Sequence, residues 1–127
     1  MSAPLLTAFT KLLVLDLEAS VGFYRTIGFT EIGRDSTFVH LRWATEGDVF
    51  LVPLPKSVKV DGKRGWGVLM CFMATTPGVD AVASKATALG SPVQGPEVQP
   101  WHTREVVVTD PDGYRLNFIE PAQAPDH

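Results

Sequence analysis

Apolar and polar positions along the chain predict the same order of elements twice. Residues 7–15 are apolar apart from Lys11 and predict a strand that stops at Asp16. Residues 17–27 then carry apolar side chains at helical spacing, with Asp16 placed to cap the helix and Gly28 placed to end it. Short strands separated by turn residues are predicted next, over residues 29–34, 37–43 and 48–53.

The second half of the chain repeats this order. Residues 68–74 predict a strand, and Thr76-Pro77 predicts a helix start, because proline suits the first helical position. The buried stripe of this helix is predicted to comprise Val79, Val82, Ala83, Ala86 and Leu89, and strands are predicted near 92–94 and over 104–110 and 114–120. Gly90 ends the helix 62 residues after Gly28, about half the chain. The predicted fold class is therefore α+β with a duplicated βαβββ module.

The composition is that of one soluble globular domain. The 127 residues are 45% apolar and 20% charged, with 11 basic and 14 acidic side chains and a net charge of −3. A nucleic-acid partner is not expected, because such proteins carry a basic excess. One cysteine, Cys71, excludes a disulfide within the chain and fits a reducing compartment. No apolar stretch approaches the roughly 20 residues that span a bilayer, and no signal peptide is recognisable, so we expect a cytoplasmic protein without a membrane partner.

One domain is expected over residues 1–121. Its two modules cover about 5–54 and 66–121, joined by a segment rich in proline, glycine and charged residues, and a flexible tail is expected over 122–127.

Two groups of residues resemble the signatures of a known family. Asp16-Leu17-Glu18, Phe23-Tyr24 and Gly28-Phe29 resemble the first-half signature of the vicinal oxygen chelate superfamily, which contains glyoxalases, bleomycin-resistance proteins and extradiol dioxygenases. Asp110-Pro111-Asp112-Gly113, followed by Tyr114-Arg115-Leu116, resembles its second-half signature. Residues 96–101, which read PEVQPW, look most like the bleomycin-resistance branch.

This resemblance implies a fold and a site. Each module would form a half barrel, with one sheet face against its helix and the other lining a groove, and the protein would be a homodimer. Enzymes of the superfamily hold a divalent metal with His, Glu or Gln. The positions that match those ligands here hold Phe9, Cys71 and Asn117, which are poor ligands for such a metal. We therefore expect no metal, no cofactor and no assigned catalytic residue.

Strand alternation and the matched ligand positions predict the lining of the groove. Which face of strand 37–43 lines it stays open. The large aromatic residues that flank the second module could stack on a planar ligand. The candidate ligand-binding residues are Phe9, Lys11, Phe38, His40, Arg42, Trp66, Cys71, Trp101, Arg115 and Asn117.

Several residues have a structural interpretation instead. Cys71 is expected to be a small core residue, although its spacing keeps it among the candidates. Trp43 is expected to pack on its own sheet edge or on a dimer interface, and Glu120 to lie on the surface at a strand end. Asp110 is expected to organise its turn through the backbone, and Gly113 to require a positive φ.

The leading hypothesis is a metal-independent protein that binds an aromatic or drug-like small molecule in a groove at a dimer interface. Lys11, Arg115 and Arg42 near the groove favour a ligand that is aromatic or partly anionic. One alternative is a metal-dependent lyase, isomerase or dioxygenase of the same superfamily. Another is a non-catalytic structural or regulatory subunit whose groove is an interface.

Overall fold

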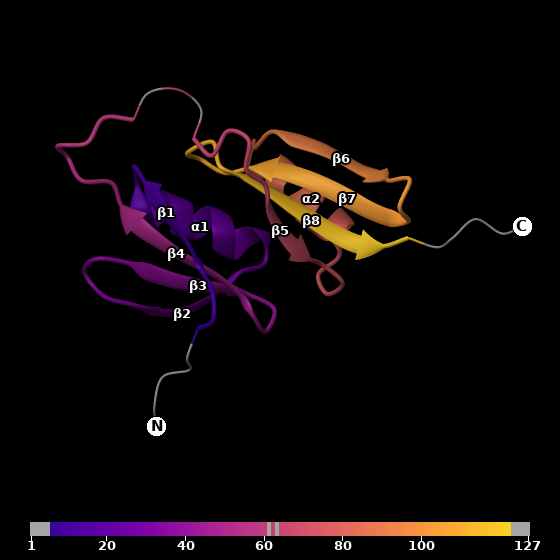
Figure 1. Ribbon diagram of the computed structural model, residues 1–127, viewed down its shortest axis with the longest axis horizontal. Helices are drawn as coiled ribbons and strands as arrows, with labels where there is room; N and C mark the ends of the chain where they lie inside the picture. Colours follow the sequence, from indigo (N-terminus) through magenta and orange to yellow (C-terminus); the bar gives the residue numbers. More distant parts are fainter. Residues whose placement is uncertain (1–5, 61, 63, 123–127) are drawn as a thin grey trace, which may run out of the picture.

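The computed structural model describes residues 6–60, 62 and 64–122, and these form two βαβββ modules (Figure 1). The first module contains β1 (Thr10–Val14), α1 (Leu17–Ile27), β2 (Thr30–Arg34), β3 (Val39–Trp43) and β4 (Gly47–Pro53). The second contains β5 (Met70–Met73), α2 (Val79–Ala88), β6 (Val93–Val98), β7 (Thr103–Thr109) and β8 (Arg115–Pro121). The predicted order of elements is confirmed, and the expected tail lies outside the described residues beyond Ala122.

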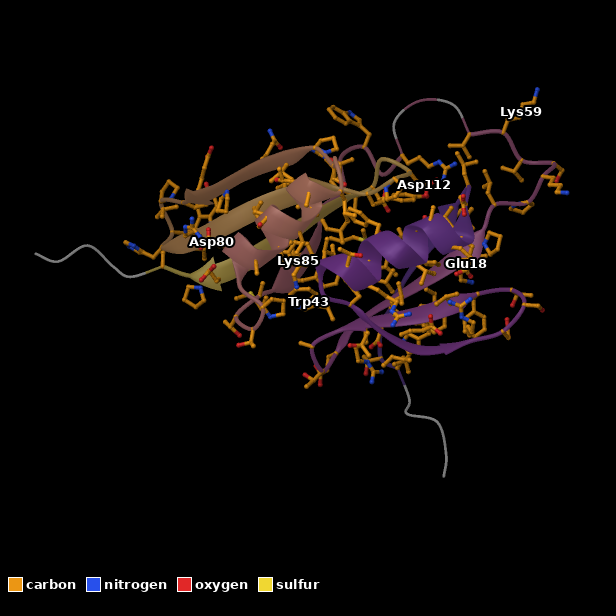
Figure 2. The ribbon with its side chains drawn as sticks, turned by 180° about the vertical axis from the view of Figure 1, so that it is seen from behind. Glu18, Trp43, Lys59, Asp80, Lys85 and Asp112 are labelled. Atoms are coloured by element: carbon orange, nitrogen blue, oxygen red, sulfur yellow. The ribbon has the colours of Figure 1, made fainter. Side chains whose placement is uncertain are left out.

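Each module forms its own four-stranded sheet. The strand orders are β1-β4-β3-β2 and β5-β8-β7-β6, with the first strand of each module parallel to its last. Both helices lie behind the sheets in Figure 1 and in front of them in Figure 2, so they cover the same side of the molecule. Each sheet therefore has one face packed on the helical layer and one face turned away from it, here called the open face.

A shared aromatic core joins the two modules. Phe29 lies 5.3 Å from Phe72 between ring centroids, and Trp43 lies 4.8 Å from Phe118. The indole Nε1 of Trp43 also donates to the carbonyl oxygen of Met73 at 2.7 Å. Trp43 lies where the modules meet (Figure 2) and is 3% exposed, so its role is structural as expected, but it packs in the core between the modules rather than on a sheet edge.

The first helix has the predicted caps. Asp16 is extended and accepts a hydrogen bond from the backbone N–H of Ala19 at 3.1 Å. Gly28 ends the helix at φ +134°, a conformation that side chains disfavour, and a Cβ there would lie 2.6 Å from the Trp43 ring. Both the backbone and the core therefore require glycine at this position.

The predicted start of the second helix is wrong. An isolated bridge between Thr75 and Gly78 makes a turn that contains Pro77, and the helix begins only at Val79. Gly78 has no side chain to cap it, and Glu120 Oε1 instead accepts the backbone N–H of Val79 at 3.0 Å. Glu120 lies near the end of β8 with a partly exposed side chain, as expected, but its carboxylate also caps α2 from another strand, a role that the surface interpretation did not include.

Smaller differences concern element ends. β1 begins at Thr10 rather than residue 7, β5 is shorter than predicted, and β6 is longer, reaching Val98 with a register irregularity between Gln94 and Glu97. Leu89 follows the last turn of α2 and is 46% exposed, so it does not belong to the buried stripe. Neither helix in the described part of the chain is long and apolar enough to cross a membrane.

The turn before β8 fixes the second module on the first. Asp110 Oδ1 accepts the backbone N–H groups of Asp112 and Tyr114, as expected of a turn-organising aspartate, and Gly113 has φ +96°. Asp112 then reaches the start of α1, where its carboxylate accepts from the Leu15 backbone at 3.0 Å and the Ser20 hydroxyl at 3.2 Å (Figure 2).

Candidate functional site

Aromatic side chains gather on the open face of the first sheet. Phe50, in the centre of β4, lies 4.6 Å from Phe9 and 5.2 Å from Phe38 between ring centroids, and the His40 ring stacks on it at 4.3 Å. Val39 and Leu41 are fully buried against the helical layer, so the alternate residues of β3 line the open face. We call Phe9, Phe38, His40 and Phe50 the aromatic wall.

A carboxylate beside this wall holds two basic side chains. Asp48 Oδ1 accepts from the His40 ring nitrogen Nε2 at 2.6 Å and from Arg42 Nε at 2.7 Å. Partial burial opposes ionisation of Asp48, but the hydrogen bonds and charges of these partners hold its pKa below the ordinary value. His40 therefore has a partner that orients its ring, which supports a positioning role for it rather than a free general base.

Polar side chains converge on the open face of the second sheet. Glu105 Oε1 accepts from Asn117 Nδ2 at 3.0 Å, and Oε2 accepts from Trp101 Nε1 at 2.8 Å and from the Thr103 hydroxyl. The Thr103 bond, together with those from Asn117 and Trp101, lowers the pKa of Glu105 despite partial desolvation. We call Cys71, Trp101, Glu105 and Asn117 the polar wall.

Cys71 is not the core residue that its apolar strand predicted. Phe72 and Ala74, which follow it in the chain, are the buried residues here, whereas Cys71 itself is exposed on the open face. Its Sγ lies 3.9 Å from Asn117 Nδ2, which agrees with the pairing of β5 and β8 at this position. The core interpretation is wrong because residues 68–74 are apolar on both faces, so hydrophobicity alone does not indicate which face is buried.

Trp66 and Arg115 contact each other beside the turn that precedes β8. The Arg115 guanidinium sits 5.3 Å from the Trp66 ring centroid. Both line an open hollow of about 1110 Å³ between α1, the end of α2 and the turn before β8. This hollow is mainly apolar, and its acidic residues Asp110 and Asp112 are already engaged with the turn and with α1.

The structure thus divides the ten candidates into three groups. The open face of the first sheet carries Phe9, Phe38, His40 and Arg42, and Lys11 is exposed there opposite Phe50. The open face of the second sheet carries Cys71, Trp101 and Asn117. The hollow is lined by Trp66 and Arg115. Sequence reasoning missed Asp48, Phe50 and Glu105 as members of these groups. The register of the β3–β4 hairpin could have indicated two of them, because Phe50 pairs with His40 and Asp48 pairs with Arg42.

The chain matches one protein family over most of its length. A model of the Glyoxalase/Bleomycin resistance protein/Dioxygenase superfamily matches residues 7–118. The chain belongs to this superfamily. The duplicated βαβββ arrangement agrees with that assignment, and the resemblance seen in the sequence is confirmed. No curated protein sequence matches the chain significantly.

Solved structures of the superfamily share the fold at low sequence identity. A bleomycin-binding protein complexed with bleomycin is 19% identical, with a TM-score of 0.64, covering 90% of this chain and 97% of that chain. TnmS3, an antibiotic binding protein from Streptomyces sp. CB03234, is 23% identical, with a TM-score of 0.68 and coverage of 96% and 99%. A family enzyme from Burkholderia phytofirmans PsJN is 21% identical, with a TM-score of 0.71 and coverage of 89% and 96%.

The residues at the matched ligand positions do not fit the divalent metal of superfamily enzymes. Phe9 has no donor atom and its ring packs on Phe50. Asn117 turns its amide nitrogen toward Glu105 and Cys71, which leaves one neutral amide and one thiol as donors. Within residues 6–60, 62 and 64–122, no three His, Cys, Asp or Glu side chains are grouped so that they could hold a metal ion.

Proposed function

We propose that this protein binds an aromatic or drug-like small molecule without a metal. The proposal places the ligand in a groove between open sheet faces of two copies, in a cytoplasmic homodimer that sequesters it. The observation that carries the proposal is the replacement of metal-ligating groups by the aromatic wall and the polar wall. An aromatic surface with a few oriented polar groups is how small-molecule sites usually combine affinity with specificity.

The aromatic wall suits a planar ligand. Three aromatic rings surround Phe50, and Phe9 is 49% exposed, so a ring laid on this face contacts π surfaces that the core does not use. Arg42 and His40 are held in place by Asp48, so this wall needs little reorganisation to receive a ligand.

The polar wall supplies the orienting hydrogen bonds. Trp101 is 63% exposed, yet its indole nitrogen is fixed by Glu105, which presents the ring as a stacking surface. Asn117 donates through Nδ2 to Glu105 Oε1 and so helps to fix the orientation of this carboxylate. Bleomycin binding and antibiotic binding by structural neighbours support the same class of ligand.

Exposed apolar side chains on both open faces support a groove completed by a second copy. Phe9 and Leu13 are 49% and 37% exposed on the first sheet, and Met73 is 59% exposed on the second. Exposed apolar patches mark interaction sites in soluble proteins. A second copy that covers these faces would bring an aromatic wall and a polar wall around one ligand.

Calorimetric titration with planar aromatic compounds tests the proposal. We choose acridone, a neutral tricycle, proflavine, a cationic one, and metal-free bleomycin. At least one should bind, and Phe9→Ala and Trp101→Ala should each weaken that ligand about tenfold, because an aromatic contact is worth on the order of 1 kcal/mol beyond its buried area. Leu15→Ala, at a 74% exposed position next to the helix start, is the matched control and should change nothing. Absence of binding across the panel would favour a structural subunit instead.

A further inference from the structure

The hollow of about 1110 Å³ lies mainly on the helical side of the molecule, close to Asp112 in Figure 2. One wall is the outward face of α1 at Gly22 and Thr26, and another is the end of α2 at Leu89 and Gly90. No residue of the aromatic wall or the polar wall lines it. Its volume suits a drug-sized molecule, since small-molecule sites measure roughly 300–1,000 Å³. The hollow is therefore a candidate site separate from the proposed groove.

Open space beside two glycines gives the hollow its depth. A Cβ at Gly22 or Gly90 would meet no atom within 4 Å. Gly22 lies inside α1 without a positive φ, so neither backbone conformation nor packing requires glycine there, although glycine weakens a helix interior relative to alanine. Leu89 is 46% exposed and adds apolar surface to the lining. A ligand in the hollow can thus approach the α1 backbone closely and contact apolar side chains.

The two carboxylates that line the hollow are not open to a ligand. Asp110 is 4% exposed, its Oδ1 accepts from two backbone N–H groups of its own turn, and its Oδ2 accepts from the Tyr24 hydroxyl. The Asp112 side chain is 3% exposed, accepts from the Ser20 hydroxyl and lies 3.4 Å from Arg64 Nη1. Every oxygen of these carboxylates therefore already has a donor or a cation, and both groups are turned away from the open space.

Arg115 is the basic group that stays available in the hollow. It is partly buried, and within the part of the chain that the structure describes it forms no ion pair. Its guanidinium lies 5.3 Å from the Trp66 ring centroid, a contact that holds the group in place. A guanidinium in such a setting favours an anion, and its planar set of N–H donors matches the two oxygens of a carboxylate or sulfonate.

We propose that this hollow is a second ligand site, which takes an organic anion with a carboxylate or sulfonate on an apolar body. The acid group binds the Arg115 guanidinium, and the apolar body lies over α1 at Gly22 and against Leu89. An anion fits better than a cation, because the accessible charge is an arginine and the carboxylates are buried with their oxygens occupied. The site lies outside the groove and does not depend on the proposed function.

Two fluorescent probes with one ring system separate charge from apolar contact. The first, 1-anilinonaphthalene-8-sulfonate, is an anion, and N-phenyl-1-naphthylamine is the same molecule without the sulfonate. Each is titrated into the full-length protein and its variants. Arg115→Gln removes the cation, and Gly22→Leu fills the hollow from an exposed helical position, where leucine is a better helix former than glycine. Arg25→Gln is the matched control, because Arg25 is exposed on the same helix and outside the lining.

We expect the sulfonate to bind about tenfold more tightly than the neutral probe. Arg115→Gln should weaken the sulfonate about three- to tenfold, as for the loss of one charge-assisted contact, and leave the neutral probe unchanged. Gly22→Leu should weaken both probes about tenfold, because its side chain occupies the space of the ring system. Arg25→Gln and the groove variant Phe9→Ala should bind both probes as the parent protein does.

Amide resonances of the isotopically labelled protein locate the bound sulfonate. Gly22, Gly90 and Gly113 line the hollow, and Gly33 does not. Addition of the sulfonate should shift the first three resonances and leave that of Gly33 in place.

The contrary results are distinct. Equal binding of the two probes, unaffected by Arg115→Gln, overturns the anion assignment. Sulfonate binding that is lost in Phe9→Ala and kept in Gly22→Leu places the probe in the groove, which overturns the second site and supports the proposed function. Failure of both probes to bind overturns the site, and conversion of a dimer into a monomer by Gly22→Leu would then assign the hollow to a second copy of the chain.

Discussion

Asp110 shows how one side chain ties together distant parts of this protein. One carboxylate oxygen holds the backbone of its own turn, and the other accepts the hydroxyl of Tyr24 from α1 at 2.6 Å. Burial raises the pKa of Asp110 despite these donors, and burial, with the charge of Asp110, raises the pKa of Tyr24. The Tyr24 hydroxyl is therefore the side-chain donor, beside two backbone N–H groups, that stabilises this buried carboxylate.

Tyr24→Phe tests this pairing. We expect a loss of about 1–3 kcal/mol in the free energy of unfolding at pH 7, because a buried carboxylate then lacks a donor. Because the pKa of Asp110 is raised in the folded protein, folding is favoured by protonation of this carboxyl group, and that stabilisation is lost as pH rises through the folded pKa. As pH falls toward 4, Asp110 becomes protonated and no longer needs the Tyr24 donor. The Tyr24→Phe loss should therefore shrink at low pH. Urea unfolding at both pH values measures it, and equal losses, or the same loss in an Asp110→Asn background, would contradict the pairing.

Gly113 tests backbone conformation separately from packing. Its φ is +96°, and a Cβ would come no closer than 4.0 Å to the Arg64 backbone, so space is not the constraint. Gly113→Val should lower the free energy of unfolding by about 1–3 kcal/mol through backbone strain alone. Gly33→Val is the control, because Gly33 has no positive φ and open space around its Cα. Equal losses of thermal stability in the two variants would contradict the assignment of backbone strain to position 113.

At the scale of elements, α2 is the helix whose N-terminus depends on a distant residue. Glu120 of β8 accepts the backbone N–H of Val79, 41 residues earlier in the chain, where Gly78 offers no side chain. Glu120→Ala should cost about 1 kcal/mol of stability, as for other lost caps. Glu120→Gln should lose less, because its amide oxygen still accepts. Chemical denaturation of both variants measures the difference, and an unaffected alanine variant would show that the cap contributes nothing.

The same helix explains where prediction from sequence stops. Both helix-ending glycines, the Asp16 cap and the order of strands depend on local residues, and all were predicted. The start of α2 depends on a contact between strand and helix, which spacing along the chain does not reveal. The prediction that Cys71 is buried was wrong for a related reason, because an apolar strand has no polar alternation to show which face is buried.

Within the candidate site, residue faces were more predictable than residue partners. Alternation placed Phe9 and Asn117 on the open faces, where the structure has them. The contact of His40 with Asp48 depends on the register of the β3–β4 hairpin. The length of the turn between the strands indicates this register, but it was not used in the prediction. The convergence of donors on Glu105 depends on side-chain rotamers, which no sequence pattern reports.

At the scale of the whole molecule, the open faces predict self-association. Sedimentation equilibrium at micromolar concentration should give a mass about twice the 13.8 kDa of the chain. Leu13→Asp should shift the equilibrium toward the monomer, because it places a charge among exposed apolar side chains of the first open face. A 13.8 kDa species at that concentration would remove the groove between copies from the account.

The most direct test of the central claim is the affinity of whichever of acridone, proflavine and metal-free bleomycin binds most tightly, measured before and after complete removal of metal. The protein is treated with a chelator and dialysed, its metal content is measured by mass spectrometry, and the calorimetric titration is repeated. Because Phe9, Cys71 and Asn117 do not form a divalent-metal site, the dissociation constant should be unchanged in the metal-free protein. If chelation abolishes binding and zinc, nickel or iron restores it, the metal-independent account is wrong and the protein is a metalloenzyme of its superfamily.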